Sequence, residues 1–284
     1  MPALYTHYRF GKAVEKELPA PLQETLADYP QAFALGTQGP DILFYHKPMK
    51  SNPVRSRGVA LHAVAPEEFF VRAAKEIVGA RKQNNDNLAD ALTAYVCGFL
   101  CHFTLDISCH PYIDEKAYGT FTHGKIESEL DKYMLRLDGL PIRGYNTATP
   151  LSAENYTVQA CADILEVKEE EIQRAIKTIK KINGWFSSKC EPFHALAHVV
   201  LKVAGMERKF GDMFLHKKDD TRFDGMGKVL LEKSNAAIEK AAALITEFMD
   251  NVDQTAECGA LHNETYQYNY SGILAKENTQ WKTV

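Results

Sequence analysis

Apolar residues recur every three to four positions along most of the chain, the spacing that places them on one face of an α-helix. No segment shows the strict alternation of apolar and polar residues that is typical of a strand. No linker-like stretch or internal repeat divides the chain. The pattern therefore predicts an all-α protein, with one multi-helix domain over residues 1–284. The expected helices span residues 4–18, 22–33, 67–81, 88–109, 123–137, 152–164, 168–183, 191–205 and 225–250.

The segment 88–109 is the most apolar of these helices, because hydrophobic residues occupy nearly every face of it. Such a helix is expected to be surrounded by the rest of the protein. Pro111 is expected to end it, since proline cannot continue the helical hydrogen bonding. Residues 35–58, by contrast, are interrupted by glycine and proline and are expected to form a long loop. Long ordered loops are often functional, which makes this one a candidate part of a site.

Three potential metal ligands lie within the apolar run of residues 98–113. His102, Asp106 and His110 follow one another at intervals of four residues, so on a helix their side chains project toward one side. A carboxylate buried without a partner would cost several kcal/mol, and a metal ion or another cation is the usual remedy. The spacing therefore indicates that the three side chains line one cavity.

The next helix repeats this spacing with His123, Glu127 and Asp131. Two adjacent helices can thus direct six nitrogen and oxygen ligands toward each other. The alternative is that each histidine is a core residue hydrogen-bonded to the backbone or to a neighbouring carboxylate. That alternative requires the same coincidence in two successive helices, so the pattern favours a metal site. Asp131 alone is equally well explained as a residue on a solvated helix face, and its role stays open.

Imidazole and carboxylate ligands favour zinc, with iron or manganese as alternatives, over calcium or magnesium. Thiolates are not expected to take part. Cys101 and Cys109 are sequence neighbours of ligand candidates, which on a helix turns them about 100° away, and both are expected to pack in the core.

The chemistry-bearing residues occur in an order that resembles a known family. The stretches are THYRFG with His7, QGPD with Asp41, a single histidine at position 62, GFLCHFTLDISCHP and HGKIESELD. This set resembles the zinc-dependent phospholipase C family, which includes bacterial phospholipases C and the N-terminal catalytic region of GPI-specific phospholipase D. The resemblance covers residues 3 to 135. It implies an all-α fold with a trinuclear zinc cluster in a cleft, and cleavage of phosphodiesters; nucleases of the P1/S1 type share this plan.

Carried over residue by residue, the resemblance implies three metal sites. One metal would bind Asp41, His62, His102 and Asp106. A second would bind His110, His123 and Glu127. A third would bind His7, Asp106 as a bridge, and the amino terminus of the chain. Asp41 is also implied as the catalytic residue that orients or deprotonates the attacking water.

The chain departs from the secreted bacterial enzymes at two places. It begins with Met-Pro, where those enzymes expose a processed N-terminal Trp. The interval from Asp106 to His110 is four residues, shorter than in those enzymes and closer to the GPI-phospholipase D version. The head-group specificity of neither branch is therefore carried over.

Charge and composition narrow the possible partners. The formal net charge of −4 does not favour binding to a phosphate backbone, so no stable nucleic-acid partner is expected. The N-terminus lacks the pattern of a secretory signal, and no stretch approaches ~18 uninterrupted apolar residues. We therefore expect a cytoplasmic protein without a transmembrane segment, with two or three zinc ions and a small-molecule or lipid phosphate ester as substrate.

Other classes fit the sequence less well. An HD-type phosphohydrolase needs an adjacent His-Asp pair, which the chain lacks. A helical di-iron protein needs a pair of Glu-x-x-His motifs, and the chain has no such pair. His194 and His198 lie on an apolar helix and are expected to pack in the core or against a cleft wall. A non-catalytic metal- or ligand-binding descendant of the same fold remains the alternative function. Three histidines lie in polar stretches and are assigned no role: His46, His216 and His262.

Overall fold

The computed structural model describes residues 3–117, 122–203 and 220–275. Within them the regular structure is helical, and the one pairing of strand type is an isolated bridge between Tyr268 and Leu274. The predicted all-α class is confirmed. The α-helices are α1 (Leu4–Val14), α2 (Ala20–Asp28), α3 (Pro30–Gly36), α4 (Pro53–Ala63), α5 (Glu67–Lys82), α6 (Asp86–Lys116), α7 (His123–Leu137), α8 (Asn155–Leu165), α9 (Glu169–Phe186), α10 (Glu191–Val203), α12 (Met226–Asp250) and α13 (Val252–Cys258). Short 3-10 helices are η1 (Glu15–Glu17), η2 (Gly39–Tyr45), η4 (Thr221–Phe223) and η5 (Glu264–Gln267).

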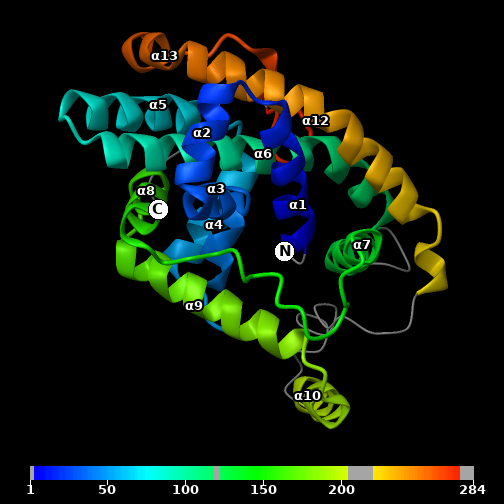
Figure 1. The fold of residues 1–284 in the computed structure, drawn as a ribbon. Helices are drawn as coiled ribbons and strands as arrows, with labels where there is room; N and C mark the ends of the chain where they lie inside the picture. The colour runs from blue at the N-terminus through cyan, green and yellow to red at the C-terminus, as the bar shows by residue number, and fades with distance from the viewer. Residues whose placement is uncertain (1–2, 118–121, 204–219, 276–284) are drawn as a thin grey trace.

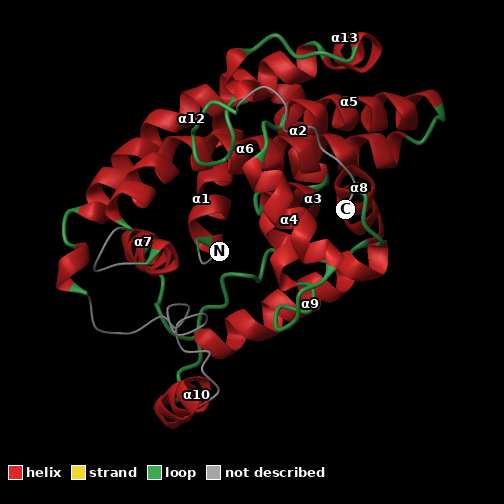
Figure 2. Cartoon of the chain, turned by 180° about the vertical axis from the view of Figure 1, so that it is seen from behind, coloured by secondary structure: helices red, strands yellow, loops and turns green. Residues whose placement is uncertain are grey.

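Helix α6 lies in the middle of the other helices (Figure 1). It contacts α1 and α3 from the N-terminal part of the chain, α5 and α8, and α12 from the C-terminal part. The view from behind shows the same arrangement, with α10 at the edge of the molecule (Figure 2). The buried apolar residues form one cluster that extends along the chain from Leu4 to Tyr270. This continuity is consistent with a single domain, which stays a prediction.

By length and composition, α6 is the one described helix that is apolar enough to cross a membrane. In this fold, 89 % of its most apolar window is buried inside the protein. Its hydrophobic surface is therefore covered by the other helices, as the sequence predicts for a central helix. That no segment spans a membrane stays a prediction.

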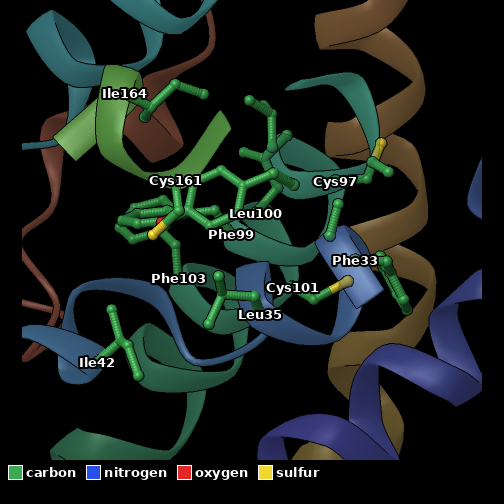
Figure 3. Close-up of a cluster of buried hydrophobic side chains, with 14 of the residues drawn as sticks. Phe33, Leu35, Ile42, Cys97, Phe99, Leu100, Cys101, Phe103, Cys161 and Ile164 are labelled. Carbon is green, nitrogen blue, oxygen red and sulfur yellow. The ribbon is translucent and has the colours of Figure 1, made fainter. Parts of the chain in front are cut away.

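Helix α3 crosses α6 at backbone contact. A Cβ atom on Gly36 would lie 2.1 Å from the carbonyl oxygen of Tyr95, and one on Gly98 would lie 2.3 Å from that of Phe33. The helices can approach so closely because both positions are glycine and have no side chain. The crossing holds Thr37, the residue that follows α3, against α6. Side chains from η2, α3, α6 and α8 fill the surrounding core (Figure 3): Phe33, Leu35, Ile42, Cys97, Phe99, Leu100, Cys101, Phe103, Cys161 and Ile164.

Two predictions about secondary structure are wrong because proline begins helices here. The expected helix 22–33 is divided into α2 and α3, since Pro30 occupies the first turn of a new helix. The expected loop 35–58 contains η2 and the start of α4. Pro53 opens α4, and the side chain of Asn52 caps it by accepting the backbone N–H of Arg55. The residues taken as loop formers are thus helix starts.

The expected end of the central helix at Pro111 is also wrong, because α6 continues to Lys116 with the proline inside it. Proline removes the hydrogen bond to the carbonyl four residues earlier, that of Ile107, and its ring crowds that carbonyl. Most of α6 is buried, and beyond the exposed proline Ile113 packs in the core, so packing outweighs that loss. Helix α7, in contrast, has the predicted bounds.

Candidate metal centre

Asp106 lies at the centre of a group of imidazoles. Its carboxylate is 3 % exposed and lies within hydrogen-bonding distance of three Nε2 atoms. Those of His7 and His110 are 3.3 and 3.4 Å from Oδ1, and that of His102 is 3.1 Å from Oδ2. His102 and His110 lie one turn before and one turn after Asp106 on α6, so the four-residue spacing places both rings beside it. His7 comes from α1, which packs on α6.

A second group combines η2, α4 and α6. Nε2 of His62 is 3.2 Å from Oδ1 of Asp41, and one ligand atom from each of these residues and from His102 lies within 4.8 Å of the others. The glycine of the Gly-Pro-Asp turn makes this possible. Gly39 has a φ of +51°, and a Cβ atom there would lie 2.2 Å from Cδ2 of His102. The turn therefore brings Asp41 to the imidazole only because position 39 has no side chain.

A third group faces α6 from α7. Oε1 of Glu127 is 3.3 Å from Nε2 of His123 and 3.8 Å from Nε2 of His110. The side chain of Thr122 caps the start of α7 by accepting the backbone N–H of Lys125. The cap fixes the position of His123, the first residue of the helix. Because His110 also contacts Asp106, the third group is continuous with the first.

Four of the five imidazoles use Nδ1 to bind an oxygen atom. Such an outer contact fixes the tautomer of a metal-ligating histidine, so that Nε2 presents its lone pair to the metal. The Nδ1 contacts are His62 with the carbonyl of Gly58 (2.7 Å), His102 with that of Thr37 (3.2 Å), His110 with that of Tyr270 (2.9 Å) and His123 with Oδ1 of Asp114 (2.8 Å). All four Nε2 atoms consequently point toward the carboxylates.

The carboxylates of the site are held as anions. Burial opposes ionisation of Asp106, but the charges of His102 and His110 outweigh it and keep its pKa well below the usual range. Burial likewise opposes ionisation of Asp41, yet contact with His62 lowers its pKa to about 2. The deprotonated carboxylate is the form that binds a metal ion.

The imidazoles divide into two kinds. Burial opposes a charge on His110, but Asp106 and Glu127 raise its pKa to about 9. For His7, burial and the neighbouring His102 lower the pKa to about 4, so this ring is neutral at physiological pH. A neutral imidazole between carboxylates is a ready ligand, whereas a charged one has a proton where a metal ion would bind.

The residues present fit zinc. Two ligand atoms on a tetrahedral zinc ion are about 3.4 Å apart when the bonds are about 2.1 Å long, close to the separations around Asp106. Among the imidazoles of the three groups, two buried nitrogen atoms make no well-aligned hydrogen bond to the described residues: Nδ1 of His7 and Nε2 of His102, although the latter lies 3.1 Å from Asp106. Buried polar atoms are almost always paired, and a cation would pair the nitrogen of His102.

The metal centre is open to solvent on the side of Asp41, His62 and His123. His102 is fully buried and Asp106 nearly so, whereas the side chains of Asp41, His62 and His123 are 21, 23 and 37 % exposed. A molecule from solvent would therefore meet Asp41 before it met Asp106.

The structure assigns Asp131 to a different role. It is buried on α7, and its carboxylate accepts the backbone N–H of Tyr5 (3.2 Å) and both the N–H (2.8 Å) and the hydroxyl (2.7 Å) of Thr6. These are first-turn amides of α1, which have no partner within their own helix. Asp131 therefore caps α1 and positions His7 beside it.

The other histidines, the amino terminus and the cysteines beside the ligand candidates lie outside the three groups or outside the described residues. His194 is buried and its Nε2 contacts the carbonyl of Ser188, in line with a packing role, but the side chain of His198 lies outside the described residues. The amino terminus, implied as a ligand, also lies outside them, as does His216. His46 is buried rather than exposed, with Nδ1 3.4 Å from the carbonyl of Glu171. Cys101 and Cys109 are buried in the core, as predicted.

Sequence reasoning did not find the oxygen atoms that orient the histidines. Three of the four are backbone carbonyls, which carry no signature of residue type, and one of these belongs to Tyr270, beyond the last predicted helix. Asp114 could have been noticed as a carboxylate one turn after His110.

Comparison with family models gives a match over residues 6–195 to zinc dependent phospholipase C. The chain belongs to this family. No curated protein and no solved structure matches it. The matched region contains every side chain of the three groups, from His7 to Glu127. The zinc-dependent phospholipase C family is one of metal-dependent hydrolases, and these three groups are where this member has candidate metal ligands.

Proposed function

We propose that the protein is a zinc-dependent phosphoric ester hydrolase, a phosphodiesterase of the phospholipase C type that acts on a lipid or small-molecule phosphate ester. The observation that carries the proposal is Asp106. One buried carboxylate contacts three imidazole nitrogens, and two further groups share His102 and His110 with it. A cluster of linked sites is what binding of several cations to one phosphate requires.

In this proposal three residue groups would hold zinc: Asp41, His62, His102 and Asp106; His110, His123 and Glu127; and His7 with Asp106. Zinc ions so held supply positive charge for the phosphate oxygens and lower the pKa of water. Asp106 bridges two groups, so its charge is shared between them.

Asp41 is the proposed catalytic residue of the chain. Its side chain lies on the open side of the centre, and His62 keeps it ionised. An ionised carboxylate accepts a hydrogen bond from water and so orients it toward the phosphorus atom. Since its pKa is low, Asp41 is better suited to orienting the water than to removing its proton completely.

Hydrolysis of two chromogenic esters tests the proposal. Bis-(p-nitrophenyl) phosphate and p-nitrophenyl phosphorylcholine would be offered to the full chain with zinc and after treatment with a chelator. We expect zinc-dependent release of nitrophenolate, and a loss of roughly 10²–10⁴-fold in kcat for Asp41→Asn. Asp253→Asn is the matched control, because Asp253 has a side chain that is 78 % exposed and lies in none of the three groups. Zinc binding without hydrolysis of either ester would favour the non-catalytic descendant instead.

A further inference from the structure

The C-terminal part of the chain forms a turn against the metal centre. We name residues Tyr268–Leu274 the C-terminal turn. Its ends are joined by the bridge between Tyr268 and Leu274, and the backbone N–H of Asn269 donates to the carbonyl of Ile273 (2.9 Å). The side-chain oxygen of Asn269 accepts the N–H groups of Ser271 (3.0 Å) and Ile273 (3.1 Å). The turn is therefore held together by its own hydrogen bonds.

Tyr270, at the tip of this turn, contacts three candidate zinc ligands. Its carbonyl oxygen is 2.9 Å from Nδ1 of His110. Its ring, buried at 1 % exposure, lies 5.1 Å from the ring of His62 and 6.0 Å from that of His102. One residue thus touches a histidine of each of the groups that contain Asp41, Asp106 and Glu127.

Gly272 attaches the turn to α6. A Cβ atom on it would lie 2.8 Å from Cγ of Pro111 and 2.9 Å from the carbonyl oxygen of Ile107, and its φ is +70°. That carbonyl has no helical partner, because Pro111 lacks the N–H that would bind it. The proline that fails to end α6 therefore creates the place where the turn packs, one residue beyond His110.

We infer that the C-terminal turn is a positioning element of the metal centre and that Tyr270 is the positioning residue within it. The carbonyl of Tyr270 holds the proton of His110 on Nδ1 and so presents Nε2 to zinc, while the ring restrains His62 and His102. The inference rests on the proposed function in that it assigns these histidines to zinc. It adds a part of the chain that lies outside residues 6–195, where the family model matches.

Outer contacts of this kind typically change metal affinity by about 10–100-fold. A turn that only covered the core would leave that affinity unchanged when it was displaced. Zinc affinity and the tautomer of His110 therefore separate positioning from packing.

Gly272→Ala displaces the turn, because the new methyl group has no space beside Pro111. Gly259→Ala is its matched control. That glycine has almost the same φ, +71°, but nothing lies within 4 Å of the added methyl group. The two variants place alanine at nearly the same φ, and only in Gly272→Ala does the added methyl group meet neighbouring atoms. Tyr270→Phe keeps both the carbonyl and the ring and is expected to bind zinc as the parent chain does.

Zinc affinity is measured by competition with a chromogenic chelator, and the tautomer of His110 by long-range ¹⁵N–¹H correlation in the zinc-free chain at a pH above the His110 pKa of about 9, where the ring is neutral. We expect Gly272→Ala to bind one zinc about 10–100-fold more weakly and to lose the single Nδ1–H tautomer. Equal zinc affinity and equal tautomer populations in the two alanine variants would overturn the inference. If Gly272→Ala does not fold, Asn269→Ala, which removes the acceptor within the turn, decides by the same comparison.

Failure of the proposed function gives a different result. A parent chain that binds zinc but hydrolyses nothing leaves the affinity comparison intact. A parent chain that binds no zinc refutes the proposed function, and the tautomer of His110 still decides whether the turn positions it.

Discussion

The carboxylate of Asp131 accepts the backbone N–H of Thr6 at 2.8 Å and so connects α7 to the first turn of α1. The same helix carries Glu127 one turn earlier, on the face that meets His110. Helix α7 therefore contributes to the site twice, by a candidate ligand and by an anchor for the helix that bears His7. The positive end of the α1 dipole lies at this carboxylate, which favours its negative charge.

Asp131 should make stability depend on pH. Burial raises its pKa to about 7, although hydrogen bonds from Thr6 and Tyr5 oppose the rise. A carboxyl group with a raised pKa binds its proton more tightly in the folded chain, so its contribution is complete below about pH 4 and is lost as the pH rises through about 7. We expect Asp131→Asn to gain stability relative to the parent chain over this range, by on the order of a few kcal/mol.

Urea unfolding of both chains between pH 4.5 and 8, without zinc, measures this difference. The histidines titrate in both chains, so their contribution cancels in the comparison. Stability curves that stay parallel across the range would show that Asp131 is ionised throughout.

Asp106 should matter for more than one metal ion, because it belongs to the group of His7 and contacts His110 of another. We expect Asp106→Asn to lose more zinc per chain than His123→Ala, which affects only the group of Glu127. Metal analysis by mass spectrometry after dialysis gives the counts. His262→Ala, an exposed histidine outside the three groups, is the control and should retain the zinc of the parent chain. Equal losses from Asp106→Asn and His123→Ala would contradict the bridging role.

A buried ion pair on α7 should be important for stability. Glu129, 4 % exposed, contacts the ammonium group of Lys132, 2 % exposed, at 2.8 Å and that of Lys125 at 2.9 Å. Removal of one charge of a buried pair leaves the other in a medium of low polarity, so Glu129→Gln should lower the free energy of unfolding by about 3–5 kcal/mol.

The exposed pair of Glu115 and Lys116 is a matched control, since its atoms are 2.7 Å apart but its charges are solvated. Glu115→Gln should have no measurable effect on unfolding by heat or urea. A similar effect of the two substitutions would mean that the pair on α7 is hydrated in solution.

The cysteines should divide into two reactive and four unreactive thiols. Burial raises the pKa of Cys97, Cys109 and Cys161 to about 12, and that of Cys101 is raised well above its usual value for the same reason. The thiolate is the reactive form, so these four should not react in the folded protein. Cys190 and Cys258 are exposed. An aromatic disulfide reagent should therefore modify two thiols per folded chain and all six in denaturant.

The double variant Cys190→Ser with Cys258→Ser should be unreactive until it unfolds. Rapid modification of any further thiol in this variant would indicate that α6 or α8 opens locally under native conditions.

Side-chain spacing was sufficient to predict the centre of the site. His102, Asp106 and His110 share one face of α6 because helical geometry leaves no other arrangement, and the structure places both imidazoles beside the carboxylate. The same rule could not assign Asp131, since a residue four positions after Glu127 faces the same way whether it binds a metal or caps a helix. Only the position of α1, a tertiary contact, decides between the two.

The parts that the sequence did not predict depend on distant backbone. The carbonyls of Thr37 and Tyr270 orient histidines 65 and 160 residues away along the chain, and a carbonyl is the same in every residue. The prediction that the central helix ends at Pro111 was wrong for a related reason. A local rule about proline ends a helix, but Cys109 before the proline and Ile113 after it pack in the core and maintain α6.

The position of α6 in the chain has a consequence for synthesis. The ribosome completes this helix at Lys116, but α12, which covers one of its sides, begins at Met226, roughly 110 residues later. At about 5–20 residues per second, the apolar surface of α6 that α12 buries stays exposed for on the order of ten seconds. We expect the nascent chain to require a chaperone during that interval, and a stalled ribosome complex that ends before α12 to be the form that aggregates.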